Sequence, residues 1–174
     1  MCVYLSSSDG VPAYADGIRE LARELVRHDL TLVYGGAHRG LMGVLADAHM
    51  EAGGRAVGVI PQALVDLEVA HRGLSELNVV DTMHQRKAMM FERADAFIVG
   101  PGGFGTLEEA FEVLTGVQLG YHVKPIVFLD LDGFWGLLQQ FLDHAVATGV
   151  LRPTTRGLFR TAATPAAAVD ALQI

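Results

Sequence analysis

Cysteine and lysine are scarce in this sequence, and long apolar runs are absent. Its 174 residues include one cysteine, Cys2, and two lysines, Lys87 and Lys124. A single cysteine excludes an intramolecular disulfide framework and a thiolate zinc site. Although 51% of the residues are hydrophobic, no stretch approaches the roughly 18 consecutive apolar residues of a membrane span. We therefore expect a cytoplasmic globular protein without a membrane partner.

Positive charge is also limited. The chain carries 13 basic and 20 acidic side chains, for a formal net charge of -7. Proteins that bind nucleic-acid polymers concentrate Lys and Arg, because phosphate contacts dominate their affinity. The acidic balance argues against such a partner. The 7 histidines are dispersed without a His-x-x-x-His pair, so we expect no metal site.

Short apolar segments alternate with amphipathic helical patterns along the chain. Continuous apolar strands separated by helices are typical of a parallel sheet covered on both faces. We therefore predict one α/β domain over residues 1–174, a Rossmann-like, doubly wound parallel sheet flanked by helices. The predicted strands are 2–6, 30–34, 55–60, 76–80, 96–99, 125–129 and a last one near 158–161. The predicted helices are 12–28, 40–52, 83–94, 106–119, 134–148 and 165–172.

Glycine, by contrast, is abundant. The chain has 20 glycines among 174 residues, about 11% against a usual level of about 7%. Many of them fall in the loops 35–43 and 100–106, which follow two predicted strands. In a doubly wound sheet, ligands bind at the carboxyl ends of the strands. Glycine lets the backbone approach a phosphate, which free N–H groups at a helix start then bind. The two loops therefore predict an anion site.

Two common nucleotide motifs do not fit these loops. A Walker loop needs Gly-Lys-Ser/Thr where this chain has Arg39-Gly40-Leu41. A dinucleotide fingerprint should follow the first strand, and here it does not. A mononucleotide or a sugar phosphate is the better inference.

Thr106 and Glu109 allow two interpretations. Their spacing has the Ser/Thr-x-x-Glu form of a capping box, in which Thr106 caps a helix and Glu109 returns to the cap amide. The same carboxylate lies beside the predicted anion loop, where it could handle a ribose hydroxyl or a water. Spacing alone does not separate the two.

Arg86 and Lys87 follow the predicted strand 76–80 at the same sheet edge. A charge pair usually forms a solvated helix face. Here basic charge is sparse, and arginine binds phosphate or ribose oxygens with a planar fork that lysine lacks. We therefore favour a functional role for Arg86.

Several of these segments together resemble the Lonely Guy (LOG) family of cytokinin riboside 5'-monophosphate phosphoribohydrolases, once mislabelled lysine decarboxylases. Residues 101–109 (PGGFGTLEE) match its PGGxGTxxE signature, and residues 83–87 (MHQRK) match MHxRK. Residues 35–43 fit its GGxxxGLMG stretch, and residues 68–74 look similar too. The resemblance spans roughly residues 2–150, with the motifs in the right order.

The resemblance implies hydrolysis of the N-glycosidic bond of a purine nucleoside 5'-monophosphate, without metal or organic cofactor, by a homodimer. It implies Arg86 and Glu109 as the catalytic pair. The implied phosphate cradle is Gly102, Gly103, Gly105 and Thr106, and the other implied substrate contacts are Ser7, Ser8, Gly36, Met83 and Lys87. The chain departs from the family at Ser6, where glycine is common, and at Gln62, where glutamate is common.

Two alternatives and one interface follow. A nucleotide- or cofactor-binding carrier of the same fold would use similar loops without hydrolysis. A pyridoxal-phosphate decarboxylase needs a Schiff-base lysine, and neither lysine stands in a convincing place. The predicted helix 106–119 is apolar around much of its circumference, so we expect it to be buried on more than one side, in a dimer interface.

Overall fold

The strands form one parallel sheet. The computed structural model describes residues 1–9, 12–67 and 69–173. In this part of the chain the sheet has 7 strands in the order β4-β3-β2-β1-β5-β6-β7, and every neighbouring pair is parallel. The strands are β1 (Cys2–Tyr4), β2 (Leu32–Tyr34), β3 (Ala56–Pro61), β4 (Glu76–Val80), β5 (Phe97–Val99), β6 (Ile126–Leu129) and β7 (Arg160–Ala162).

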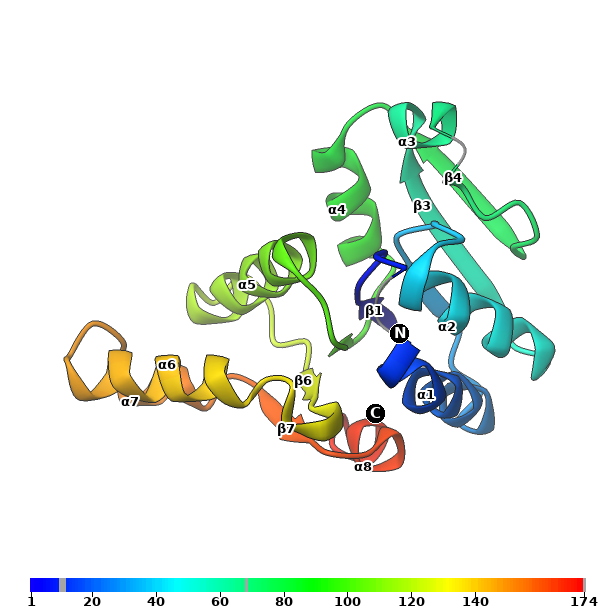
Figure 1. The fold of residues 1–174 in the computed structure, drawn as a ribbon. Helices are drawn as coiled ribbons and strands as arrows, with labels where there is room; N and C mark the ends of the chain where they lie inside the picture. Colours follow the sequence, from blue (N-terminus) through cyan, green and yellow to red (C-terminus); the bar gives the residue numbers. More distant parts are fainter. Residues whose placement is uncertain (10–11, 68, 174) are drawn as a thin grey trace.

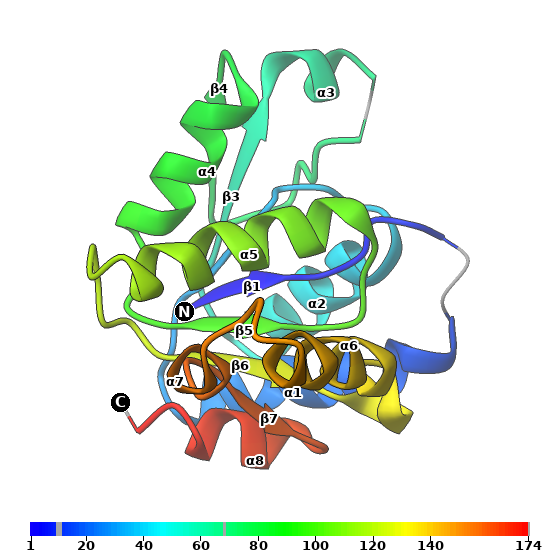
Figure 2. The same cartoon turned by 90° about the vertical axis from the view of Figure 1, so that its left-hand side faces the viewer.

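Helices cover both faces of this sheet (Figures 1 and 2). On one face lie α1 (Ala15–Arg27), α2 (Gly40–Glu51) and α8 (Pro165–Asp170); on the other lie α4 (Met83–Glu92), α5 (Phe104–Gln118) and α6 (Gly136–Ala147). Short elements complete the fold: η1 (Pro12–Tyr14), α3 (Gln62–Asp66), η2 (Leu131–Gly133) and α7 (Pro153–Arg156). The predicted doubly wound α/β fold is confirmed.

The strands are apolar on both faces because helices cover both faces of the sheet. Successive side chains of a strand point to opposite faces, so Val3 packs in the cluster under α1 and α2, while Cys2 and Tyr4 pack in the cluster under α4 and α5. Burial raises the pKa of the Cys2 thiol to about 12. The residue is therefore an inert part of the core.

The chain reverses its winding direction beside β1, which pairs with β2 on one side and β5 on the other. Open α/β sheets bind ligands in the crevice at such a switch point. The loops after β1, β2 and β5 all open at this edge, and they include both glycine-rich loops. The topology thus brings the predicted anion-binding segments together.

Most differences from the predicted elements lie at their ends. Strand 2–6 is shorter, as Cys2–Tyr4, and helix 12–28 divides into η1 and α1. The short helices α3 and α7 were not predicted, since 5 and 4 residues are too few to show a helical period. No helix in the described residues is long and apolar enough to cross a membrane.

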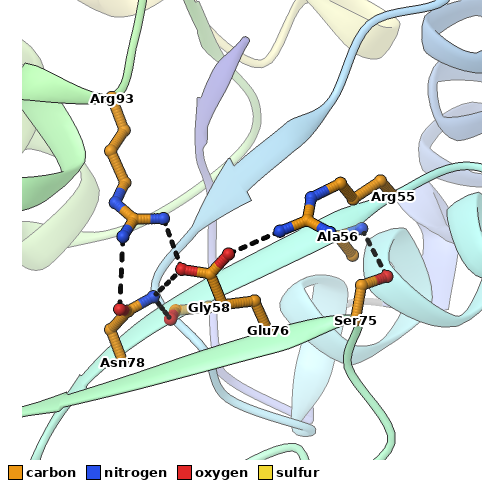
Figure 3. A network of polar contacts seen from close by, with 7 residues as sticks. All are labelled: Arg55, Ala56, Gly58, Ser75, Glu76, Asn78 and Arg93. Carbon is orange, nitrogen blue, oxygen red and sulfur yellow. Dashed lines mark hydrogen bonds and ion pairs between the residues drawn. The ribbon is translucent and has the colours of Figure 1, made fainter.

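A polar network fixes the edge strand β4 (Figure 3). Glu76 binds Arg55 before β3 and Arg93 after α4, each at 2.5 Å. The side-chain amide of Asn78 donates one hydrogen bond to Glu76 and accepts one from Arg93. These hydrogen bonds, chiefly those from Asn78 and Arg93, lower the pKa of the Glu76 carboxyl. The network ties the carboxyl end of α4 to the sheet, and α4 carries Arg86.

Candidate active site

A cavity of about 390 Å³ opens at the carboxyl edge of the sheet, beside the switch point. The β1 loop contributes residues 6–8, and the β2 loop contributes Gly35, Ala37 and Arg39. The first turn of α5 contributes residues 103–106, and α4 contributes residues 83, 86 and 87. Of the sequence-predicted site residues, the cavity lining includes Ser7, Ser8, Met83, Arg86, Lys87, Gly103, Gly105, Thr106 and Glu109.

Arg86 is held in the wall of this cavity with 5% of its surface exposed. Its Nε donates to the Val59 carbonyl at 3.1 Å, and its Nη2 donates to the Gly35 carbonyl at 3.2 Å. The third guanidinium nitrogen, Nη1, lies 3.5 Å from Oε1 of Glu109. A buried cation needs such partners, and they fix the direction in which the guanidinium points.

Gly35 makes room for this arginine. A β-carbon at this position would overlap the guanidinium of Arg86. The sequence instead predicts a ligand contact at the neighbouring Gly36, whose φ of 74° needs glycine. A β-carbon added at Gly36 would meet Ile60 and Val59, and Gly36 does not line the cavity. Of the two glycines, Gly35 therefore has the more direct link to the site. The sequence carries no signal that would place Gly35 against Arg86.

Glu109 faces Arg86 from α5 and is also 5% exposed. Its Oε1 atom is buried and accepts no hydrogen bond from the described residues. Burial raises the pKa of this carboxyl to about 7, and the nearby Arg86 opposes that shift only in part. A carboxyl of this kind exchanges its proton near neutral pH, which suits a general base.

The capping-box interpretation of Thr106 and Glu109 is wrong. Helix α5 begins at Phe104, with Gly103 as its N-cap and no side-chain cap, so Thr106 is already inside the helix. A capping box does exist one helix earlier, where Thr82 and Gln85 cap α4 reciprocally. The Gln85 of the MHQRK segment therefore has a structural role, and the Glu109 carboxylate is left for the cavity.

The start of α5 faces the cavity, and no side chain among the described residues caps it. The first N–H groups of a helix have no partner inside it, and glycine at the cap supplies no side chain. β-carbons added at Gly103 and Gly105 would meet nothing within 4 Å, so both glycines border open space. Gly102 differs, because a β-carbon there would overlap the side chain of Thr106. It supports the turn without lining the cavity.

The loop after β1 caps the N-terminus of the other helix at the cavity, α2. The carboxylate of Asp9 accepts a bond from the Gly40 N–H at 3.2 Å, and the Ser6 carbonyl accepts one from the Met42 N–H at 3.2 Å. The Ser6 hydroxyl accepts a bond from the Ser8 N–H at 3.0 Å. The serine that replaces the usual glycine thus shapes this loop. The other departure, Gln62, binds Asp66 within α3 and does not line the cavity.

Lys87 lines the cavity but is already paired. Its ammonium binds Glu108, and it lies 3.1 Å from Glu112. The hydrogen bond to Glu108 is the main reason that the pKa of Lys87 is raised. Lys124, the other lysine, donates to the Phe91 carbonyl at 2.7 Å and is not part of the cavity lining. Among residues 1–9, 12–67 and 69–173, no group of three or more His, Cys, Asp or Glu side chains could hold a metal ion.

Comparison with known proteins supports the resemblance. A family model described as "Possible lysine decarboxylase" matches residues 42–172. The chain is 45% identical over 163 residues to cytokinin riboside 5'-monophosphate phosphoribohydrolase LOG5 of Arabidopsis thaliana, covering 93% of this chain and 72% of that protein. It is 46% identical over 163 residues, with the same coverage, to the probable enzyme LOGL9 of Oryza sativa subsp. japonica. The chain belongs to the LOG family.

Solved structures extend the LOG-family fold to more distant proteins. A molybdenum cofactor binding protein from Rippkaea orientalis matches with a TM-score of 0.77 at 19% identity, over 99% of this chain and 93% of that one. The molybdenum cofactor carrier protein of Chlamydomonas reinhardtii matches with a TM-score of 0.75 at 22% identity, over 99% and 94%. At these identities the matches show a common fold alone.

Several residues that line the cavity of this LOG-family chain were not predicted as ligand contacts, among them Leu64, Val69 and Arg39. Leu64 and Val69 give the cavity an apolar side, and Arg39 gives it a further cation. Arg39 was visible as part of a glycine-rich loop. Leu64 lies in the short helix α3, which is too short to show a helical period, and Val69 lies in the sequence stretch 68–74 that resembles the family. Only the fold places these two side chains at the cavity.

Proposed function

We propose that the protein hydrolyses the N-glycosidic bond of purine nucleoside 5'-monophosphates, either AMP or nucleotides of N6-modified adenine, and releases the free base and ribose 5-phosphate. The observation that carries this proposal is the buried pair of Arg86 and Glu109, 3.5 Å apart, in the same cavity wall as the uncapped start of α5. The names of the curated relatives support the same reaction.

In this proposal the start of α5 binds the 5'-phosphate. The N–H groups and side chain of this turn, around Gly103, Gly105 and Thr106, offer donors to an anion, and the helix dipole favours negative charge there. Holding the phosphate fixes the ribose relative to Glu109. The apolar side of the cavity, with Leu64 and Val69, suits a purine base.

Glu109 then acts at the anomeric carbon. The C1'–N9 bond breaks with its electron pair going to the base, and positive charge develops on the ribose ring. A carboxylate stabilises such an oxocarbenium-like state and accepts a proton from the attacking water. The water oxygen bonds to C1', while the departing base takes up a proton. Arg86 orients Glu109 and binds nucleotide oxygens with its remaining N–H groups.

The lysine decarboxylase reading is not supported by the lysines. A Schiff-base lysine must lose its proton to attack a carbonyl, yet the raised pKa of Lys87 keeps it charged. Lys124 lies outside the cavity lining.

The proposal is tested by incubating the protein separately with AMP and with N6-isopentenyladenosine 5'-monophosphate. Free base is measured by chromatography and ribose 5-phosphate by a coupled assay. We expect the two products in equal amounts, and their rates identify the preferred base. Binding of either nucleotide without product release would contradict hydrolysis and leave the carrier function. Glu109→Gln serves as the inactive control.

We also propose a homodimer through the exposed face of α5 and α6. In the described chain α5 is buried along one side only, and Phe111 is 36% exposed. On α6, Leu137 and Phe141 are one turn apart and 79% and 62% exposed. Large apolar groups of this kind mark interaction surfaces. Sedimentation equilibrium should give a dimer, and Phe141→Glu should shift it toward monomer; a wild-type monomer at all concentrations would refute the proposal.

A further inference from the structure

The cations that line the cavity are not equivalent. Arg86 pairs with Glu109 and two carbonyl oxygens, and Lys87 pairs with Glu108 and Glu112. Arg39 is exposed and lines the same cavity. No ion pair or side-chain hydrogen bond joins it to another residue within 1–9, 12–67 and 69–173. Of the three cations that line the cavity, Arg39 is therefore the one whose charge the described residues leave for a ligand.

The backbone that carries Arg39 is fixed at several points. The next residue, Gly40, has a φ of 55° and donates to Asp9, and a β-carbon there would overlap the backbone of Ser8. The preceding residue, His38, donates from its N–H to the Val69 carbonyl at 2.9 Å. The base of the Arg39 side chain is therefore held at the cavity, while its long stem leaves the guanidinium free to reach a ligand.

The two helix starts at the cavity distinguish where an anion fits. The start of α2 already receives the Asp9 carboxylate and the Ser6 carbonyl. The start of α5 has no side-chain cap, and Gly103 and Gly105 border open space. A phosphate bound there would carry charge that neither Arg86 nor Lys87 is free to balance fully.

We propose that Arg39 binds the 5'-phosphate of the substrate from the β2 loop, as the cationic partner of the α5 start. This inference rests on the proposed function for its substrate class. The planar guanidinium matches two phosphate oxygens at once, and such charge-assisted pairs are stronger than neutral hydrogen bonds. Arg39 thereby makes the site select nucleotides over nucleosides.

The test compares the wild type with Arg39→Ala, Arg39→Lys and the control Arg23→Ala, an exposed arginine of α1. Kinetics with AMP and adenosine give kcat and KM, and calorimetry gives the Kd of both ligands. We expect Arg39→Ala to raise the KM and Kd for AMP about tenfold or more, with kcat changed less. The ratio of kcat/KM for AMP to kcat/KM for adenosine should fall by the same factor as the KM for AMP rises. Arg39→Lys should recover part of that ratio, and Arg23→Ala should match the wild type.

The proposal is overturned if Arg39→Ala weakens the binding of AMP and of adenosine by the same factor, because Arg39 would then contact the base or the ribose. It is also overturned if neither ligand is affected, or if the wild type binds no AMP. Failure of the proposed function gives a different result. A wild type that binds AMP but releases no base refutes hydrolysis, while the calorimetric comparison of AMP with adenosine still decides the role of Arg39.

Discussion

Nη1 of Arg86 and Oε1 of Glu109 lie 3.5 Å apart, and both residues are 5% exposed. They come from different helices, α4 and α5, which precede and follow β5 and cover the same face of the sheet. The arginine is anchored to the sheet through Val59 and Gly35. Oε1 of the Glu109 carboxylate accepts no hydrogen bond within the described part of the chain, so its protonation and position depend on the arginine and on the ligand.

Replacing Glu109 with Gln should abolish turnover while the fold is kept. The amide has nearly the same volume but cannot stabilise positive charge on the ribose or accept a proton from water. We expect kcat to fall about 100-fold or more, with a KM for AMP within a few-fold of the wild type. Release of adenine measures the rate, and circular dichroism checks the fold. Near-normal turnover in the folded variant would remove Glu109 from the mechanism.

The activity of the wild type should depend on pH through Glu109. Burial raises the pKa of this carboxyl to about 7, and the ionised form is the active one in the proposed mechanism. Below that pH, kcat/KM for AMP should fall about tenfold per pH unit, and above it the value should level off. The phosphate of AMP titrates in the same region, so an AMP analogue with a difluoromethylene phosphonate, whose second pKa is lower than that of the phosphate, provides the control. A profile that falls as pH rises through 7 would instead assign Glu109 as an acid.

The same carboxyl should make stability depend on pH. Its folded pKa of about 7 lies above the ordinary value of 4.5, so the folded state holds the proton more tightly than the unfolded chain. The contribution is fully present below the unfolded pKa and is lost as pH rises through the folded pKa. Glu109→Gln should therefore stabilise the protein at pH 8 by up to about 3 kcal/mol, and far less at pH 5. Urea unfolding at both values measures this, and an equal effect at the two pH values would contradict it.

The sequence predicted the sheet, and it placed Arg86 and Glu109 at one edge of that sheet, because both leave local signals. Continuous apolar strands between amphipathic helices indicate a parallel sheet, and the loops that end such strands must meet at one edge. Arg86 and Glu109 lie in dense motifs at that edge. The pairing partners of Arg86 were beyond prediction, since Val59 and Gly35 are 27 and 51 residues away in the chain.

The start of α5 was misplaced for a similar reason. Thr106 and Glu109 have the spacing of a capping box, and local sequence cannot tell it from two residues in successive turns of a helix that begins earlier. The structure begins α5 at Phe104 because Gly103 takes the cap position. The choice between Gly35 and Gly36 likewise depended on a contact with Arg86, which only the folded chain supplies.

Gly35→Ala should damage both the fold and the activity. The new β-carbon would overlap the guanidinium of Arg86, which is buried and bonded to carbonyl oxygens, so the arginine must shift. Overpacking of this kind destabilises by about 1–3 kcal/mol, and displacement of Arg86 should lower kcat as well. Thermal unfolding and AMP hydrolysis measure the two effects. A variant with wild-type stability and turnover would show that Arg86 has room to move without consequence.

Gly105→Ala, unlike Gly35→Ala, should raise stability while it weakens the binding of AMP. Gly105 lies in the first turn of α5, and its β-carbon would meet nothing within 4 Å, so the fold tolerates the substitution. Alanine is the better helix former, and we expect a gain of up to about 1 kcal/mol in the free energy of unfolding. The added methyl group would occupy the space proposed for the 5'-phosphate, so the KM for AMP should rise severalfold while the KM for adenosine changes less. Gly120→Ala, at an exposed turn with a φ of 75°, is the control that should lose stability without altering KM. If Gly105→Ala leaves the affinity for AMP unchanged, the phosphate does not bind at the start of α5.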